Sequence, residues 1–356
     1  MKILHIAPYN ISGVPLTMVK AERALGHESR LITLKRDQRN FEEDICLGSF
    51  LWDQKLLLLI KNILYFRDHR LATNKINSSD TIPPIWKPAN QLVEIMIKIR
   101  DTIIKPKIYN AIKKYNLDEF DVYQLDGGQG FFRFNDIIPY WHNLGKKVIC
   151  CYYGNDLRRR GVIKDIDAVS DLNITVEWDH LDLHQNIHHV YYPFDAARFQ
   201  MISKEPGDSI KIGHSPTNRV AKGSGIIINA VNNLKKKYSV ELVLIENVSY
   251  STLLKMRATC DIGIDQLGDL GYGISALEWL AMGIPVASCI APEMEKSGMA
   301  HPLVKIDEQN IEEQLGKLIA DIDYRRELGI AGRKWIEENH DAKRIVQQIH
   351  KLAGLI

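Results

Sequence analysis

The segment from Asp269 to Ser288, DLGYGISALEWLAMGIPVAS, restricts the fold of this chain more than any other. Gly271 and Gly273 bracket Tyr272, and glycine lets a backbone approach a ligand without an obstructing Cβ. We predict a helix from Ile274 to Met282, because this run lacks glycine and proline and repeats apolar residues at helical spacing. A glycine and a proline just beyond it end the helix, and an apolar strand begins there. The segment therefore predicts a loop, a helix, a turn and a strand of an α/β fold.

The start of this predicted helix is suited to binding an anion. The first N–H groups of a helix have no partner within it, and the helix dipole adds partial positive charge. Glu278 follows one turn later, on a side that a bound nucleotide would reach. The alternative is an ordinary turn in which Glu278 faces solvent, and the segment alone leaves both interpretations open.

The same order of strand, loop and helix occurs in two series along the 356 residues. The first series opens at Lys2 and the second at Lys211, and Tyr191–Phe199 reads as the linker between them. A chain of this length favours two domains of about 150–200 residues each. We therefore predict an α/β protein with an N-terminal domain over residues 1–195, a second domain over 200–340 and a final helix over 341–356.

Composition excludes several classes of protein. A formal net charge of +2 gives no argument for a nucleic-acid partner. The five cysteines form no CxxC pair and suit buried thiols in a reducing cytoplasm. No apolar run is long enough to span a membrane, and the first ten residues read as a strand and not as a signal peptide. We expect a cytoplasmic globular protein.

Loops after three predicted strands of the first domain carry candidate functional residues. Gly13 follows the first strand, and the sequence DGGQG follows the strand that ends at Leu125. A third strand ends in Tyr153-Gly154-Asn155-Asp156, just before three arginines. Because ligands bind at the carboxyl ends of strands in open α/β sheets, Tyr153 and Asp156 are candidates for a catalytic or acceptor loop. A solvated turn is the alternative. The first loop lacks GxGxxG, which disfavours a nicotinamide site.

Two interpretations remain for a helix predicted from Val93 to Lys114. Its basic residues are Lys98, Arg100, Lys105, Lys107, Lys113 and Lys114. The common case is a core helix with a solvated basic face. The second is a basic and apolar surface that touches an anionic membrane. A further apolar helix is predicted from Leu56 to Phe66.

Histidines cluster after the strand predicted at Ile174–Glu177. His180, His184 and His188 are spaced by four residues, which invites a metal site. The HExxH pattern is absent, so a metal is not favoured.

Two cations precede a helix predicted from Ile226 to Leu234. Arg219 and Lys222 lie just before Gly223, although cations are disfavoured beside the positive end of a helix dipole unless an anion is present. The two side chains and the helix N–H groups therefore form a candidate clamp for two phosphates. The Walker A pattern is absent.

Together these residues resemble retaining glycosyltransferases of the GT-B fold, in the family called glycosyl transferases group 1, or family 4. The matching elements are Arg219 with Lys222-Gly223, the strand Cys260–Ile264, and GYGISALEWLAMGIPVAS with Glu278. The match is firm from about 210 to 340 and looser elsewhere. It implies two Rossmann-like domains with parallel sheets facing across a cleft, and a C-terminal helix that crosses back to the N-terminal domain.

The resemblance also implies an activity. This is the transfer of a sugar, with retention, from a nucleotide-diphosphate-sugar donor to a glycan or lipid-linked acceptor, as in polysaccharide biosynthesis (hexosyltransferase type, EC 2.4). Arg219 and Lys222 would stabilise the leaving diphosphate, and Glu278 would bind the ribose. The implied donor-binding residues are Gly13, Arg219, Lys222, Gly271, Tyr272, Gly273 and Glu278. No metal or cofactor is expected besides the nucleotide-sugar, and no nucleic-acid partner. The expected location is cytoplasmic, with peripheral contact at the inner membrane face through the basic and apolar helices.

The chain departs from the family pattern at three positions. Leu270 occupies the place of the family's first carboxylate, so Asp269 or Asp265 would take over its role. Tyr153 stands where a catalytic histidine is frequent, and the spacing between Arg219 and Lys222 is three residues and not about five. We therefore name Tyr153, Asp156 and Asp269 as the catalytic candidates.

These departures keep other functions open. A catalytically degenerate GT-B domain that binds a glycan or a protein without turnover is the main alternative. A sugar-nucleotide epimerase is a third, disfavoured because the sequence offers no clear pair of acid and base residues.

Overall fold

The computed structural model describes residues 1–37, 39–48, 82–203, 207–268 and 270–356. The chain divides into an N-terminal unit, Met1–Val190 with Ile345–Ile356, and a C-terminal unit, Tyr191–Arg344. The helix predicted from Leu56 to Phe66 lies outside the described residues. The described helices include none that is long and apolar enough to cross a lipid bilayer.

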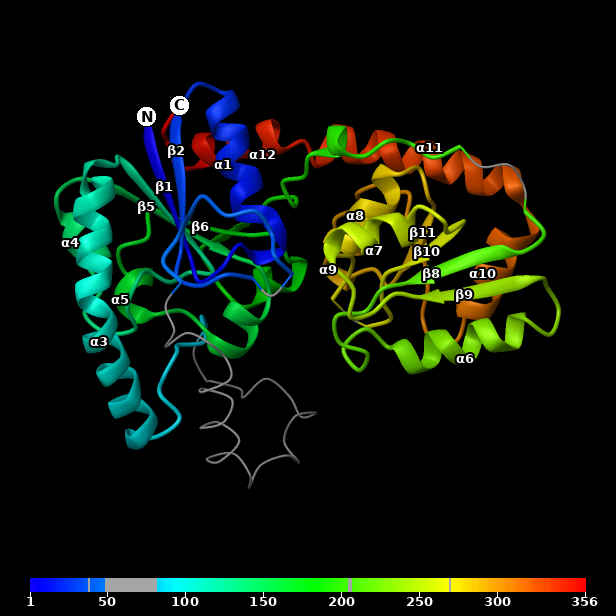
Figure 1. Ribbon diagram of the computed structural model, residues 1–356, viewed down its shortest axis with the longest axis horizontal. Coiled ribbons are helices and arrows are strands. Elements are labelled where there is room, and N and C mark those ends of the chain that lie inside the picture. The colour runs from blue at the N-terminus through cyan, green and yellow to red at the C-terminus, as the bar shows by residue number, and fades with distance from the viewer. Residues whose placement is uncertain (38, 49–81, 204–206, 269) are drawn as a thin grey trace. The chain divides into compact units, whose positions relative to one another are not determined.

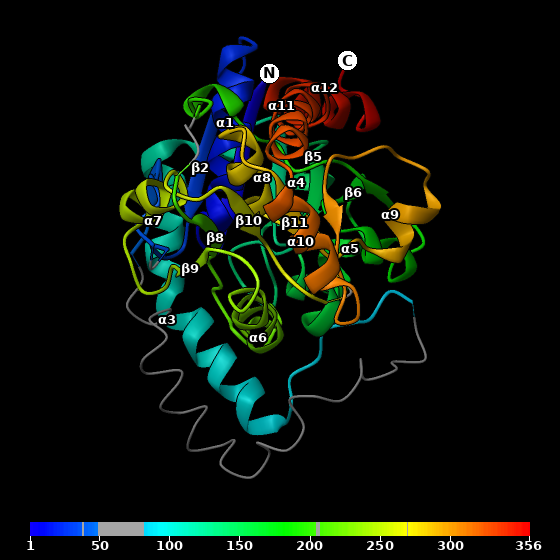
Figure 2. The same ribbon diagram turned by 90° about the vertical axis from the view of Figure 1, so that its right-hand side faces the viewer.

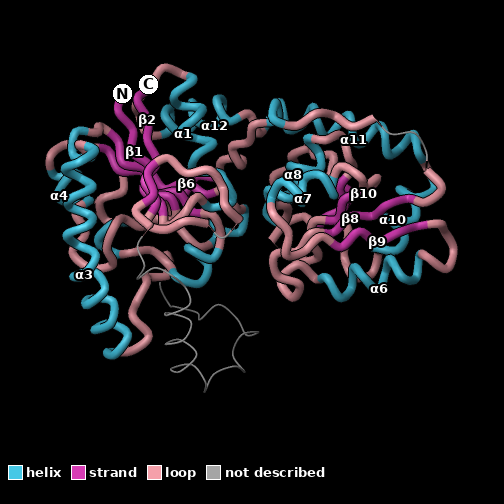
Figure 3. The backbone as a smooth tube through the Cα atoms, viewed as in Figure 1, coloured by secondary structure: helices cyan, strands magenta, loops and turns pink. Residues whose placement is uncertain are grey.

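A parallel sheet forms the centre of the N-terminal unit (Figure 3). Its seven strands have the order β3-β2-β1-β4-β5-β6-β7. Its strands are β1 (Lys2–Ala7), β2 (Glu28–Thr33), β3 (Ile45–Cys46), β4 (Val122–Asp126), β5 (Lys147–Tyr152), β6 (Leu172–Thr175) and β7 (Ile187–His189). Its helices and helical turns are η1 (Ile11–Gly13), α1 (Val14–Ala24), α3 (Gln91–Tyr115), η3 (Leu117–Glu119), α4 (Ile138–Asn143), η4 (Asp156–Arg160), α5 (Lys164–Asp167) and η5 (Trp178–Asp182).

Side chains of β1 alternate between the two faces of this sheet. Leu4 and Ile6 enter the main core, where α3 contributes Ile104. Ala7 packs on the other face against Leu16 of α1. The last helix, α12 (Ala342–Leu352), lies beside α1 on that face (Figure 1).

The C-terminal unit contains a second parallel sheet of five strands, in the order β12-β11-β10-β8-β9. Its strands are β8 (Ile210–His214), β9 (Val240–Leu244), β10 (Ile262–Ile264), β11 (Val286–Ser288) and β12 (Val304–Lys305). Its helices are η6 (Ala196–Arg198), α6 (Ser224–Leu234), α7 (Tyr250–Arg257), α8 (Ile274–Ala281), α9 (Pro292–Lys296), α10 (Ile311–Ala320) and α11 (Ile322–Asn339). Figure 2 shows α6 and α8 on opposite sides of β8 and β10.

Two glycines determine how closely α8 packs on this sheet. Gly213 of β8 and Gly263 of β10 are paired in register, and the indole of Trp279 lies over both of them. A Cβ at Gly263 would come within 2.7 Å of Trp279 Cγ, so the large ring fits only because both strands lack side chains there.

Four short elements, β3, β7, α5 and α9, were not predicted from the sequence. Each has five residues or fewer, which is too short for a hydrophobic period to be recognised. The final helix, predicted over residues 341–356, is observed from Ala342 to Leu352.

Candidate functional site

Lys222 and Asp265 form an ion pair at the carboxyl edge of the second sheet. Lys222 lies just before α6, and Asp265 follows β10 directly. The Lys222 Nζ lies 2.7 Å from Asp265 Oδ1, and the lysine side chain retains 18% exposure. The other oxygen of Asp265 accepts a hydrogen bond of 2.8 Å from the N–H of Gly273. One carboxylate therefore connects Lys222 with the start of α8.

The starts of α6 and α8 are open to an anion. Gly223, in the left-handed region with a φ of 64°, precedes α6, and Gly273 precedes α8. As glycines, neither residue has a side chain that could cap its helix, although Asp265 binds the N–H of Gly273 at the start of α8. A cation just before a helix is expected to have an anion beside it, and in this structure the anion beside Lys222 is the Asp265 carboxylate.

His214 ties the end of β8 to its neighbours. Its Nδ1 donates to the carbonyl of Ile264 over 3.0 Å, and its Nε2 accepts from the hydroxyl of Ser224 over 2.8 Å. Burial lowers the pKa of His214 and keeps the imidazole neutral. This residue orients the first turn of α6, and the sequence analysis did not single it out.

Glu278 takes part in a buried ion pair. The side chain is 5% exposed, one carboxylate oxygen pairs with Arg257, and the other accepts a 2.5 Å hydrogen bond from Tyr250. Arg257 also donates to Ser215 Oγ over 2.6 Å and to Ser275 Oγ over 2.5 Å. Burial lowers the pKa of Arg257 to about 10. Both oxygens of Glu278 thus have protein partners, and its contact with a ribose stays a prediction.

Arg219 and Lys222 have different partners. The Arg219 guanidinium is 56% exposed and pairs with both oxygens of Glu246, at 2.7 and 2.5 Å. The structure therefore gives Arg219 and Lys222 separate carboxylate partners and does not join the two cations in one clamp.

The glycine-rich loop before α8 is anchored by Tyr272. Its ring is buried against Trp335, and its hydroxyl lies 3.2 Å from His340 Nε2. The φ of Gly271 is 78°, which favours glycine. Leu270 is 41% exposed, and Asp269 lies outside the described residues.

In the N-terminal unit, Tyr153 and Asp156 have separate roles. The Tyr153 hydroxyl donates to Asp126 Oδ1 over 2.6 Å, and burial together with the Asp126 charge raises the pKa of Tyr153. The Asp156 carboxylate accepts from the backbone N–H groups of Tyr153, Gly154 and Leu157 at 2.8–2.9 Å. Asp156 thus orders the turn after β5, and Tyr153 keeps its proton.

Behind Tyr153 lies a buried chain of charged groups. His5 Nδ1 lies 2.9 Å from Asp126 Oδ2, and His5 Nε2 lies 3.0 Å from Glu22 Oε2. Burial opposes the imidazolium, but the two carboxylates outweigh it and raise the pKa of His5 to about 10. His350 of α12 reaches the other oxygen of Glu22 at 3.3 Å. In the sequence, the one sign of this buried network is the position of His5 inside an apolar strand.

Gly13 and the histidines after β6 hold local structure. Gly13, with a φ of 78°, precedes α1. His180 Nδ1 lies 2.7 Å from Thr175 Oγ1, and His184 Nε2 lies 3.0 Å from Asp167. Across the described ranges, no group of three or more histidine, cysteine, aspartate or glutamate side chains is placed to hold a metal ion.

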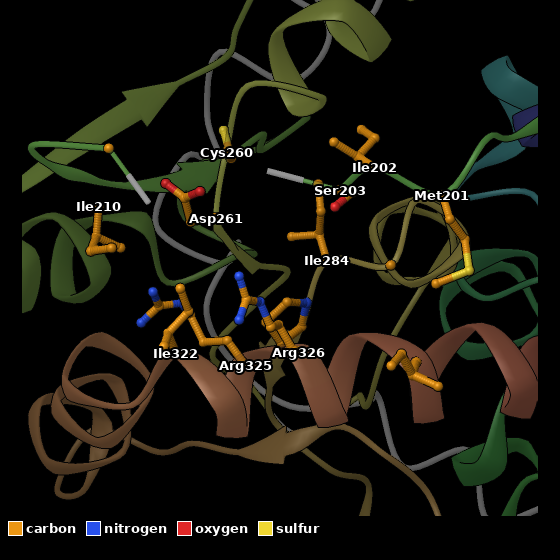
Figure 4. A pocket seen from close by; sticks show the side chains of 14 residues that line it. Met201, Ile202, Ser203, Ile210, Cys260, Asp261, Ile284, Ile322, Arg325 and Arg326 are labelled. Carbon is orange, nitrogen blue, oxygen red and sulfur yellow. The ribbon is translucent and has the colours of Figure 1, made fainter. Parts of the chain in front are cut away.

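A hollow of about 350 Å³ opens at the amino ends of β8, β10 and β11 (Figure 4). Asp261, Arg325 and Arg326 line its polar part. Arg325 donates to the carbonyls of Leu318 and Ile319 at the end of α10. The hollow lies at the edge of the sheet opposite Lys222 and Asp265, so it is separate from the candidate site.

No protein-family model and no curated protein matches this sequence. Solved structures do. HepE from Anabaena in complex with UDP has a TM-score of 0.57 and 12% identity, over 100% of both chains. Sucrose-phosphate synthase from Thermosynechococcus elongatus has a TM-score of 0.57 and 12% identity, over 99% of this chain and 98% of that one.

A third similar structure is a glycosyltransferase from Rickettsia africae, with a TM-score of 0.57 and 13% identity, over 99% of this chain and 97% of that chain. At 12–13% sequence identity, these similarities show a shared fold and do not show a shared function. The chain therefore has the GT-B fold of these glycosyltransferase structures, with two parallel α/β sheets.

Proposed function

We propose that this protein transfers a sugar from a nucleotide-diphosphate-sugar to an acceptor. The observation that carries the proposal is the Lys222–Asp265 pair, which lies between the starts of α6 and α8, each preceded by a glycine. The fold supports it, since HepE with the same fold was solved with UDP. A fold hosts many activities, so the argument rests on the site.

Lys222 is the residue that we expect to bind the diphosphate. An ammonium group has three donors, and the one bound to Asp265 leaves two for phosphate oxygens. The helix N-termini add partial positive charge where the leaving group gains negative charge during transfer. Gly271 and Gly273 would allow the backbone to approach the phosphates. Gly13 and Tyr272 stay predicted donor contacts, and Asp269 a predicted catalytic residue.

Tyr153 is the group that we expect to meet the acceptor, with the buried Asp126 behind it holding its hydroxyl. The acceptor is proposed to be a glycan or a lipid-linked sugar, and the transfer is proposed to retain configuration without a metal ion. The Tyr153 hydroxyl stays protonated and donates its one hydrogen to Asp126, so it can accept a hydrogen bond from the acceptor but does not act as a base.

Helix α3 supports a peripheral contact with a membrane. It exposes large apolar side chains at helical spacing, with Leu92, Ile95, Ile99 and Ile103 each more than half exposed. Exposed Lys98, Lys105 and Lys107 lie along the same helix. A helix with apolar and basic side chains on its surface suits an anionic lipid surface, such as one that carries a lipid-linked acceptor.

A catalytically degenerate domain remains the second candidate. Leu270 supports it, because its exposed apolar side chain cannot bind sugar hydroxyls as a carboxylate does. Release of free nucleotide from a sugar nucleotide, with or without an acceptor, separates an enzyme from a binding module.

Calorimetry tests the donor site. The protein is titrated with UDP, GDP and ADP, and we expect one of them to bind. Lys222→Ala should weaken that binding about tenfold or more, because a hydrogen bond to a charged group is lost. Lys235→Ala, at the exposed end of α6, removes the same charge and should bind as the unsubstituted protein does. Equal affinity in Lys222→Ala, or no binding of any of the three nucleotides, would overturn the assignment.

A further inference from the structure

Arg133 and Arg160 lie in loops that follow two paired strands of the first sheet. Arg133 is in the loop after β4, and Arg160 ends η4, the turn after β5. The carboxyl ends of parallel strands form the edge at which open α/β sheets bind ligands. Both arginines therefore belong to loops where a ligand of the N-terminal unit would bind.

The Nη1 atom of Arg133 is buried and has no hydrogen-bond partner among the described residues, whereas the residue as a whole is partly exposed. Only its backbone N–H binds Asp101, over 2.9 Å. The guanidinium carbon lies 5.5 Å from the ring centre of Trp86. A cation–π contact of this kind offsets only part of the free energy needed to bury an unpaired charge.

Arg160 has only neutral partners in the part of the chain that the structure describes. Its Nε donates to the Gly161 carbonyl over 2.9 Å, and its two terminal nitrogens lie 3.4 Å from oxygens of Gln129 and Gly128. Arg158 on the same turn differs, because it donates to the carboxylates of Glu177 and Asp179 at 2.5–2.6 Å. The fold thus supplies carboxylates to Arg158 and leaves Arg160 with weak neutral contacts.

In the described part of the chain, the carboxylates near Arg133 and Arg160 do not form ion pairs with their guanidinium groups. Burial lowers the pKa of Arg133, and the neighbouring positive charges of Arg160 and Arg100 lower it further. Burial also lowers the pKa of Arg160. The carboxylates that act on the pair, Asp101 and Asp156, already hold other donors: Asp101 binds Arg100 and backbone N–H groups, and Asp156 binds three backbone N–H groups.

We propose that Arg133 and Arg160 bind a phosphoryl group. Two guanidinium groups with free donors suit the oxygens of a phosphate, which would supply the acceptors that the protein does not. Gln129 and Gly128 hold Arg160 in orientation for that ligand. Resting on the proposed function, the phosphoryl group belongs to the acceptor, so the acceptor is a phosphorylated molecule, either soluble or lipid-linked.

Hydrogen exchange on the full chain tests this site directly. Inorganic pyrophosphate is added at constant ionic strength, and protection of amides is measured by mass spectrometry. We expect slower exchange in residues 128–134 and 158–161. UDP is the parallel probe for the donor site and should protect residues 213–225 and 265–276. Protection of residues 128–134 by vesicles of phosphatidic acid as well as by pyrophosphate would place the phosphoryl group on a lipid, and protection by soluble pyrophosphate alone would place it on a soluble acceptor.

Substitutions identify the residues involved. Arg133→Gln and Arg160→Gln should each weaken the pyrophosphate-dependent protection about tenfold or more and leave the UDP response unchanged. Arg159→Gln, at an exposed position of the same turn, should leave both responses unchanged. Arg160→Lys keeps a charge but loses the fork of donors, and it should give an intermediate response if the glutamine variants fold poorly.

The two proposals fail in different ways. Absence of pyrophosphate protection at 128–134 and 158–161 in the unsubstituted protein overturns the phosphoryl site, whatever UDP does. Absence of UDP protection in the C-terminal unit overturns the donor site and leaves the phosphoryl site standing.

Discussion

His5 Nε2 lies 3.0 Å from Glu22 Oε2, and both side chains are inaccessible to solvent. The histidine belongs to β1 and the glutamate to α1. On its other side His5 meets Asp126, which binds Tyr153. An imidazolium between two buried carboxylates thus connects the first strand with the loop that we assign to the acceptor.

The first prediction concerns the free energy of unfolding as a function of pH. The pKa of His5 is raised from 6.5 to about 10, so its contribution is complete below pH 6.5 and is lost as pH rises towards 10. The pKa of Glu22 is lowered from 4.5 to about 2, so its contribution is present above pH 4.5 and is lost as pH falls towards 2. Chemical denaturation should therefore show the largest contribution of this pair between pH 4.5 and 6.5.

Substitution of His5 tests the assignment. His5→Gln removes the positive charge between two buried carboxylates, and we expect a loss of about 3–5 kcal/mol near pH 6 that shrinks towards pH 10. The exposed His188→Gln is the control and should keep the profile of the unsubstituted protein. A loss of equal size at pH 6 and pH 10 would show that His5 is neutral.

The second prediction concerns the packing of Trp279 on the second sheet. Gly263→Ala places a Cβ within 2.7 Å of the indole, and we expect overpacking to cost about 1–3 kcal/mol. Gly316→Ala in α10 meets nothing closer than 3.8 Å and should stabilise the helix by about 0.5–1 kcal/mol. Urea unfolding of both variants measures the difference. Equal stabilities would contradict the close approach of Trp279.

The third prediction separates the two roles of Glu278. Glu278→Gln leaves Arg257 buried without a counter-charge, which should cost about 3–5 kcal/mol of stability. The double variant Arg257→Met with Glu278→Leu removes both charges and should recover most of that loss. We expect its nucleotide affinity to stay low, because the ribose contact is absent. Full affinity in a stable double variant would remove Glu278 from the donor site.

The fourth prediction concerns helix α3 and lipid. The protein should sediment with vesicles that contain anionic phosphatidylglycerol and not with pure phosphatidylcholine, and added salt should weaken the binding. Ile99→Ser with Ile103→Ser should reduce it, since both side chains are more than half exposed. Tyr140→Ser, an exposed residue of α4, is the control. Equal binding of the Ile99/Ile103 variant and the control would place the contact elsewhere.

Much of the fold was predictable from local sequence. The helices predicted at Ile226–Leu234 and Ile274–Met282 are observed as α6 and α8, with bounds that differ by two residues or fewer. Periodicity, glycine and proline act over a few residues, so a single chain displays them. The short elements β3 and α9 were missed because they depend on neighbours in space and show no period of their own.

The sequence by itself determined the two α/β series, the candidate loops at strand ends, and the charged residues before α6 and within α8. Only the tertiary structure decided which charges meet. Lys222 pairs with Asp265, Arg219 with Glu246 and Glu278 with Arg257, partners between 21 and 43 positions apart. The physical reason is that these partners are distant in the sequence and come within hydrogen-bonding distance only when strands and helices pack together. The Asp269–Ser288 segment therefore predicted a ligand site at the start of α8. The tertiary structure added that the Asp265 carboxylate connects Lys222 with that helix start.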